Sequence, residues 1–252
     1  MFINRLEVPY RTKKPRKKGL TSIMDVGLST RELEMILNDY SDYVDIAKLG
    51  VGIAAVSPNL EEKISLYHKF DIKVYFGGTL FEKFHFQNRL TNLKDILLKY
   101  EIDFVEISNG TIDLSLSERK DLISFFTGSD IDVLCEVGSK DKQKTMPPSE
   151  WINEIEILLK EGAKYVITEG RNSGTAGLFG PNGELRTDLI DDIIHTIDPA
   201  NLILEAPTGD SQMFLINLIG SNVNLGNVNP HDILLLEAER VGLRSETFKI
   251  NS

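Results

Sequence analysis

Short runs of apolar and β-branched residues alternate along the chain with longer segments whose apolar positions recur every three or four residues. The first kind predicts buried strands, and the second predicts amphipathic helices. The predicted strands span residues 20–25, 44–49, 72–76, 103–108, 131–137, 164–169, 201–205 and 222–225. The predicted helices span residues 29–38, 59–70, 88–100, 117–126, 149–161 and 188–196, and several begin with a Ser, Asn or Asp that can cap them.

Strands that alternate with helices pair in parallel through right-handed crossovers. Eight such units in 252 residues predict a closed (β/α)8 TIM barrel, with an open doubly wound sheet as the competing architecture. No linker rich in Pro, Gly or Ser divides the chain, so we expect residues 1–252 to form a single TIM-barrel domain with a short basic N-terminal extension over residues 1–19.

The extension carries a basic run that could be read as a nucleic-acid arm, but no aromatic residues interleave with it to stack on bases. We therefore expect a solvated N-terminal segment. The basic residues are Arg11, Lys13, Lys14, Arg16, Lys17 and Lys18.

The formal net charge of −10 argues against a protein that binds nucleic acid or an anionic membrane through its overall field. Apolar stretches such as residues 233–236 are too short to span a bilayer, and Cys135 has no second cysteine to pair with. We expect a cytoplasmic protein with small-molecule substrates and no nucleic-acid or membrane partner. Barrels of this size commonly associate, so a homo-oligomer is also expected.

Polar residues gather where the predicted strands end, which is where the chemistry of a TIM barrel lies. A set of carboxylates with few His or Cys side chains suits a hard cation such as Mg²⁺ better than zinc. Only two or three of them would be needed, because Mg²⁺ retains several waters. The candidate metal ligands are Asp25, Glu106, Glu136, Glu169 and Glu205.

Two loops could hold an anion. Residues 171–177 offer the guanidinium of Arg171, two hydroxyls and glycine backbone N–H groups. Residues 209–212 and 226–227 follow the last two strands, where TIM barrels often bind phosphate. Either loop could also be an ordinary turn.

Blocks of residues at these strand ends, in order over almost the whole chain, resemble the phosphosulfolactate synthase family. They are Pro15-Arg16 with Gly19-Leu20-Thr21, Asp25 with Gly27-Leu28, Ala47-Lys48-Leu49-Gly50, Phe76-Gly77-Gly78-Thr79-Leu80-Phe81-Glu82, Val105-Glu106-Ile107-Ser108-Asn109-Gly110, Glu136-Val137-Gly138 with Lys140, Glu169-Gly170-Arg171 with Ser173-Gly174, Glu205-Ala206-Pro207, Asn222-Val223-Asn224-Leu225 and Gly242-Leu243-Arg244.

The resemblance implies a TIM-barrel lyase that adds sulfite to phosphoenolpyruvate with Mg²⁺ and gives (2R)-phosphosulfolactate, the first step of coenzyme M synthesis in methanogens and a route to sulfolactate in bacteria. It implies Lys140 as the general acid, with Lys48 as the alternative acid or a phosphate partner. It further implies substrate binding by Arg171, Ser173, Gly174, Asn109, Asn224 and Asn227.

The chain departs from the family pattern at two positions. Val26 and Gly209-Asp210 stand where family members often carry a basic residue. These departures leave open a non-catalytic, stress-associated descendant of the family. The barrel fold leaves open a second alternative, a Schiff-base aldolase that uses Lys48 or Lys140 as nucleophile.

Overall fold

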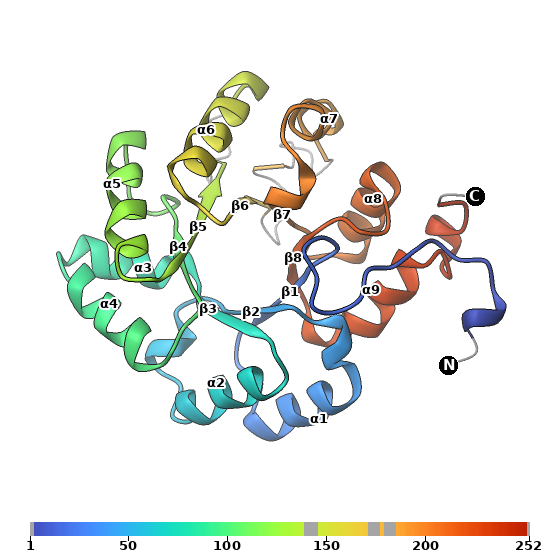
Figure 1. The fold of residues 1–252 in the computed structure, drawn as a ribbon, viewed down its shortest axis with the longest axis horizontal. Coiled ribbons are helices and arrows are strands. Elements are labelled where there is room, and N and C mark those ends of the chain that lie inside the picture. The colour runs from blue at the N-terminus through green and yellow to red at the C-terminus, as the bar shows by residue number, and fades with distance from the viewer. Residues whose placement is uncertain (1–2, 139–145, 171–176, 179–184, 251–252) are drawn as a thin grey trace.

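Eight parallel strands close into a barrel in chain order, each paired with the next and β8 paired with β1 (Figure 1). The computed structural model describes residues 3–138, 146–170, 177–178 and 185–250. The closed order confirms the (β/α)8 prediction and excludes an open doubly wound sheet. The strands are β1 (Thr21–Asp25), β2 (Ile46–Leu49), β3 (Lys73–Phe76), β4 (Phe104–Ile107), β5 (Asp132–Val137), β6 (Tyr165–Thr168), β7 (Leu202–Glu205) and β8 (Leu225–Val228).

Helices surround the barrel (Figure 1). They are α1 (Thr30–Tyr40), α2 (Leu60–Lys69), α3 (Gly78–Phe86), α4 (Leu90–Lys99), α5 (Leu116–Thr127), α6 (Pro148–Glu161), α7 (Thr187–Thr196), α8 (Gly209–Ile219) and α9 (Ile233–Arg240). The sequence did not predict α3, α8 or α9. Both α3 and α8 begin with glycine, a poor helix former, and α9 opens on four consecutive apolar residues without helical periodicity.

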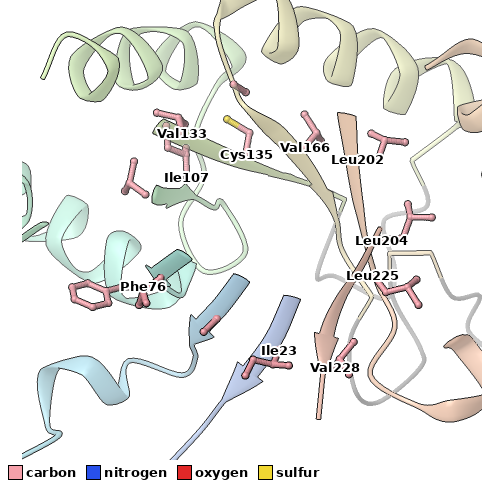
Figure 2. Close-up of a cluster of buried hydrophobic side chains, with 14 of the residues drawn as sticks. Ile23, Phe76, Ile107, Val133, Cys135, Val166, Leu202, Leu204, Leu225 and Val228 are labelled. Atoms are coloured by element: carbon pink, nitrogen blue, oxygen red, sulfur yellow. The ribbon is translucent and has the colours of Figure 1, made fainter. Parts of the chain in front are cut away.

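Each strand has two faces with different roles. Side chains on the outer face, such as Ile23, Val133 and Leu204, pack with buried residues of the surrounding helices in the main core (Figure 2). The alternate side chains point into the barrel. Their lowest apolar layer consists of Leu20, Ile46, Tyr75, Phe104, Leu134, Ile167 and Ile203.

The next inward position along these strands lies two residues later, nearer the C-terminal end of the barrel. This position is charged on β2, β4, β5 and β7, and directly after the end of β6. The side chains are Lys48, Glu106, Glu136, Glu169 and Glu205, and all five are buried. We call these five residues the lumen layer. The apolar layer beneath them closes the barrel floor, so the lumen layer lies nearest the C-terminal end of the barrel, the region that we call the cup.

Strand β8 lies three residues later than predicted, at Leu225–Val228 rather than 222–225. The register between β1 and β8 slips by one residue between Thr21 and Ile23, and Asn227 has a φ of 55°. This irregularity obscures the apolar pattern on which the prediction rested. As a result Asn224 precedes the strand instead of ending it.

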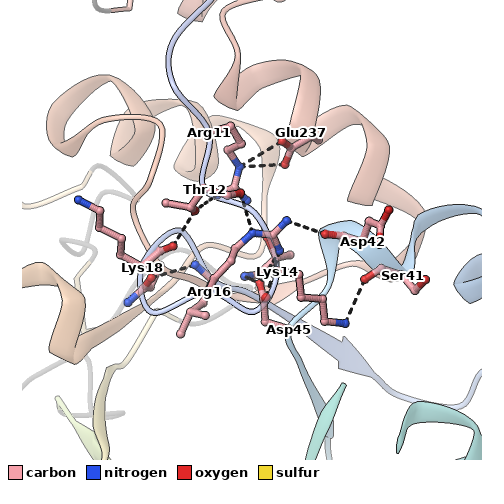
Figure 3. Close-up of polar contacts among 12 residues, drawn as sticks. Arg11, Thr12, Lys14, Arg16, Lys18, Ser41, Asp42, Asp45 and Glu237 are labelled. Carbon is pink, nitrogen blue, oxygen red and sulfur yellow. Dashed lines mark hydrogen bonds and ion pairs between the residues drawn. The ribbon is translucent and has the colours of Figure 1, made fainter. Parts of the chain in front are cut away.

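The expectation of a solvated N-terminal segment is wrong for several of its basic residues (Figure 3). Arg16 pairs with Asp45 at 3.0 Å, and Arg11 pairs with Glu237 of α9 at 3.1 Å. The Lys14 ammonium donates to the carbonyls of Ser41 and Phe70 at 3.3 and 2.7 Å. The basic run of residues 11–18 therefore closes the N-terminal end of the barrel through these contacts. Its remaining lysines, Lys13, Lys17 and Lys18, are exposed.

Within the described ranges, no helix combines the length and the apolar character needed to cross a membrane.

Candidate active site

The lumen layer brings together five of the residues that the sequence singled out. Lys48 lies between two carboxylates from strands on different sides of the barrel. Its Nζ is 3.1 Å from Oε2 of Glu106 and 3.4 Å from Oε1 of Glu205. Because β2 and β7 are not neighbours in the barrel, the second contact crosses the lumen. Buried ion pairs of this kind fix the position of the ammonium.

The electrostatics of the layer determine the charge state of Lys48. Burial alone would lower its pKa, but the carboxylate of Glu106, followed by the Tyr75 phenol and the carboxylates of Glu205 and Glu136, outweighs the burial, so the pKa is raised well above its ordinary value. The amine therefore stays protonated at neutral pH. A lysine in this state is suited to attracting anions and unsuited to nucleophilic attack.

Tyr75 of the floor supports Lys48 from below. The Lys48 Nζ lies 5.9 Å from the centre of the Tyr75 ring, within the range of a cation–π contact. Burial, and then the acidic neighbours, raise the pKa of Tyr75, with Lys48 acting in the opposite direction. The phenol is thus neutral. Its contact with Lys48 could not be predicted, because an aromatic residue within an apolar strand is typical of the core.

A second cluster surrounds Glu136. The hydroxyl of Ser108, just after β4, lies 3.2 Å from Oε1 of Glu136 and 2.8 Å from Oε1 of Glu82 on α3. Glu82 also accepts hydrogen bonds from the backbone N–H groups of Gly110 and Thr111 at 2.6 and 3.2 Å. Sequence reasoning did not select Glu82 as a site residue. Glu82 lies four residues after Gly78, so the two residues share one face of a helix. This spacing is the sequence feature that could have identified Glu82.

Glu205 is anchored by the end of the neighbouring strand. The backbone N–H of Gly170 donates to its Oε2 at 2.9 Å. A Cβ at Gly170 would lie 2.6 Å from the backbone oxygen of Glu205, so only glycine permits this approach. Glu169, the residue before it, is buried in the same layer. The ends of β6 and β7 are therefore locked together at the mouth.

The structure does not bring Asp25 into the lumen, which corrects its assignment to the metal site. Asp25 shares the outer face of β1 with Ile23, facing α2. There it accepts hydrogen bonds from Gly27, Leu28 and Tyr67, each at 2.9 Å, and pairs with Lys63 at 2.7 Å. Side chains alternate between the two faces of a strand, and this alternation turns Asp25 towards the helices. The prediction rested only on the end of the strand at which Asp25 lies.

Asn224 is also corrected. Its side chain accepts from the backbone N–H of Leu20 at 2.9 Å and donates to the carbonyl of Leu202 at 2.9 Å. Both partners lie at the N-terminal end of the barrel, away from the mouth. Asn227 does lie at the C-terminal end, and Asn109 is partly exposed in the loop after β4.

Four predicted site residues, Lys140, Arg171, Ser173 and Gly174, lie outside the residues that the structure describes. The second predicted anion loop is visible. There Thr208 and Ser211 form a reciprocal cap at the start of α8, so the Ser211 hydroxyl is used in capping that helix.

Val26, one of the two departures from the family pattern, is exposed at the mouth. It lines a cavity of 390 Å³ between the ends of β1 and β8, together with Pro207, Asn227 and His231. His231 pairs with Glu32 at 3.3 Å on the same rim. The missing cation thus affects the rim of the cup, beside the lumen layer.

Oxygen donors dominate the lumen, but in the part of the chain that the structure covers no group of three or more His, Cys, Asp or Glu side chains is arranged to hold a metal ion. Mg²⁺ commonly takes one or two protein carboxylates and completes its shell with water and substrate oxygens. The four lumen glutamates fit that kind of site in their chemistry.

Comparison with known proteins gives a consistent result. Residues 9–246 match the family model described as (2R)-phospho-3-sulfolactate synthase (ComA). The phosphosulfolactate synthase of Bacillus subtilis is 41% identical over 246 residues, covering 96% of this chain and 97% of that protein. The phosphosulfolactate synthase of Methanocaldococcus jannaschii is 38% identical over 237 residues, covering 92% and 94%.

Solved structures show the same fold at low identity. A 3-hexulose-6-phosphate synthase from Salmonella typhimurium has a TM-score of 0.58 at 12% identity and covers 88% of this chain and 99% of its own. The YdjI aldolase from Escherichia coli K12 also has a TM-score of 0.58, at 14% identity, covering 88% and 85%. At these identities the likeness establishes the barrel and nothing about its chemistry.

Proposed function

Because this chain belongs to the (2R)-phospho-3-sulfolactate synthase family of enzymes, we propose that it joins sulfite to phosphoenolpyruvate with Mg²⁺ and forms (2R)-phosphosulfolactate. In this reaction the sulfite sulfur attacks the methylene carbon of phosphoenolpyruvate and a carbon–sulfur bond forms. Negative charge moves onto the substrate carboxylate, and the carbon that bears the phosphate then takes up a proton. We place the reaction in the cytoplasm.

The observation that carries the proposal is the buried Lys48 ammonium held between Glu106 and Glu205 at the base of the cup. Both substrates are anions, and a site lined only with carboxylates would repel them. A protonated lysine that is held in one position is a preorganised positive centre. Such a centre stabilises negative charge as it develops in the transition state.

The Mg²⁺ is assigned to one or two of the lumen carboxylates Glu106, Glu136, Glu169 and Glu205, all of them buried oxygen donors. When bound, the metal supplies Lewis-acid stabilisation of charge on the substrate carboxylate. Glu205 is held by the Gly170 N–H, and Glu136 contacts the Ser108 hydroxyl, so both carboxylates are oriented by the protein itself.

The proton donor is assigned to Lys140, an assignment that rests on the family resemblance. Lys48 is the weaker candidate for that role, because its raised pKa makes it reluctant to release a proton. We therefore give Lys48 the task of holding anionic groups of the substrate, and Arg171, Ser173 and Gly174 the task of binding the phosphate or sulfonate.

The direct test mixes the purified protein with phosphoenolpyruvate, sulfite and Mg²⁺ and follows both phosphoenolpyruvate loss and phosphosulfolactate formation. We expect turnover that stops with a chelator and returns with added Mg²⁺, and we expect Lys140→Ala to be inactive but folded. No phosphoenolpyruvate loss, under conditions where the Bacillus subtilis relative converts it, contradicts the proposal.

Two alternatives make different predictions in the same assay. A Schiff-base aldolase would be trapped irreversibly by borohydride with a carbonyl substrate, but the protonated, ion-paired state of Lys48 disfavours that lysine as the nucleophile. A non-catalytic descendant would bind phosphoenolpyruvate without consuming it, or would bind neither substrate.

A further inference from the structure

Glu82 is a buried acid outside the lumen layer whose hydrogen bonds all lead towards the proposed site. It lies on α3 and is 2% exposed. Its Oε1 is the acceptor for three donors: the Ser108 hydroxyl and the backbone N–H groups of Gly110 and Thr111. A carboxylate that accepts several hydrogen bonds holds the donor groups strongly and fixes their positions.

The first turn of α3 packs closely enough against the end of β4 for the Glu82 carboxylate to reach Ser108. Gly78 lies one turn before Glu82 on the same buried face of the helix. A Cβ at Gly78 would lie 2.4 Å from Cβ of Ser108 and 2.8 Å from Oε1 of Glu106. The glycine therefore allows the helix to touch the end of β4 directly, and Glu82 reaches over the following loop.

The Ser108 hydroxyl has a single proton and two carboxylate neighbours. Its Oγ lies 2.8 Å from Oε1 of Glu82 and 3.2 Å from Oε1 of Glu136, so the two carboxylates share this donor, and the shorter contact, to Glu82, fixes the position of the oxygen. Glu82 thereby sets how Ser108 meets Glu136, a lumen carboxylate. Through Gly110 and Thr111 it also fixes the loop that carries Asn109, a predicted substrate-binding residue.

We propose that Glu82 is a positioning residue for the reaction: acting through Ser108 and the backbone of residues 110–111, it holds Glu136 and Asn109 in the arrangement that the substrates require. This role rests on the proposed function, since it concerns the same cup. Glu82 touches no reacting atom and is not a catalytic residue. Displacement of catalytic groups by about 1 Å can cost 10²-fold in rate.

The test compares Glu82→Gln, which keeps the shape and one acceptor oxygen, with Glu82→Ala, which removes the contacts. We expect kcat/KM to fall about 10-fold for the first and about 100-fold for the second, the range found for groups that orient active-site ligands. The fall should appear in the folded protein, with kcat changing more than KM. The matched control is Asp45→Asn, a buried carboxylate at the other end of the barrel that also accepts a backbone N–H, from Thr21. It should lower stability and leave kcat/KM unchanged.

A double-mutant cycle with Ser108→Ala tests the route. If Glu82 acts through Ser108, Glu82→Gln will cost less in the Ser108→Ala background than in the wild type. Equal costs in the two backgrounds, or wild-type kcat and KM in Glu82→Ala, would overturn the inference.

Amide hydrogen exchange separates this inference from the proposed function. Exchange at Gly110 and Thr111 should be at least about 10-fold faster in Glu82→Gln, whether or not the chain turns over phosphoenolpyruvate, because both amides lose a charged acceptor. Unchanged exchange overturns the positioning role by itself. Absence of turnover in the wild type overturns the proposed function and leaves the exchange result to decide the role of Glu82.

Discussion

The two ends of this barrel both bury charged side chains, but they use them differently. At the N-terminal end the buried carboxylate of Asp45 accepts from the Arg16 guanidinium and from the Thr21 N–H. There the buried guanidinium of Arg240 donates to the carbonyls of Ser221, Val223 and Leu20. At the C-terminal end the lumen layer has four glutamates and, among the residues that the structure describes, one lysine.

The contrast shows that a concave surface alone does not identify an active site. The larger cavity, of 750 Å³, lies at the N-terminal end and is lined by Arg16, Asp45 and the apolar residues of the floor. Charges of both signs there neutralise one another, so the polar groups contribute to stability. The lumen layer instead gathers four buried carboxylates around Lys48 at the C-terminal end, which is the end where TIM barrels carry their active sites.

The largest effect should come from breaking the closure of the N-terminal end. Asp45→Ala leaves the Arg16 guanidinium buried without its carboxylate, and the Thr21 N–H loses its acceptor. We expect the free energy of unfolding to fall by about 3–5 kcal/mol, the usual cost of breaking a buried ion pair. Urea unfolding measures it. The folded fraction should keep the wild-type kcat/KM, and a loss of activity beyond the folded fraction would remove the distinction between the two ends.

The reciprocal experiment removes the positive centre of the other end. Lys48→Met should lower kcat about 10²- to 10³-fold, the cost of losing one preorganised electrostatic contact in an active site. The matched control is Lys63→Met, which breaks the buried pair with Asp25 on the helix side of the barrel wall. The control should lower the midpoint of thermal unfolding and spare kcat. Similar kcat losses in both variants would contradict the assignment of Lys48.

The sequence predicted the barrel well because its signal is carried by many strands at once. Each apolar run found its strand except the last, where the Asn227 irregularity shifted β8 by three residues. The site was predicted only in part. The strand-end pattern selected Lys48 and the four lumen glutamates, and the structure brings these five side chains together. The pattern did not show whether a residue at a strand end faces into the barrel or towards the helices. Asp25 was misassigned for that reason.

Asn224 gives the third prediction, because it was expected to bind substrate and lies at the N-terminal end. Asn224→Ala leaves the buried N–H of Leu20 without its acceptor. We expect a loss of about 1–3 kcal/mol in the free energy of unfolding and no change in KM. Asn227→Gly, at the mouth, removes the amide side chain and keeps the φ of 55° without strain, so it should raise KM for phosphoenolpyruvate with little effect on stability. Substrate titration and urea unfolding of both variants check this pair.

The smallest effect concerns two lysines, one from each end, whose pKa values are shifted in opposite directions. Burial lowers the pKa of Lys14, and the carboxylates of Asp45 and Asp71 offset this lowering only in part. The carboxylates of the lumen raise the pKa of Lys48 above its ordinary value of 10.5. Lys48 therefore contributes stability that is complete below pH 10.5 and is lost only as the pH rises through its still higher value in the folded protein.

For Lys14 the sign is reversed, because the folded protein holds that proton less tightly than the unfolded chain does. The free energy of unfolding should rise as the pH climbs from the lowered pKa of Lys14 towards 10.5, with a slope below about 1.4 kcal/mol per pH unit, the limit for one proton. Denaturant unfolding of the wild type, Lys14→Met and Lys48→Arg between pH 7 and pH 10 measures both. As the pH rises, the free energy of unfolding of the wild type should increase relative to that of Lys14→Met. The difference in this free energy between the wild type and Lys48→Arg should stay constant. A slope in the Lys48→Arg comparison would mean that this lysine titrates near neutrality, and the lumen would then hold a proton donor where we have placed a fixed positive charge.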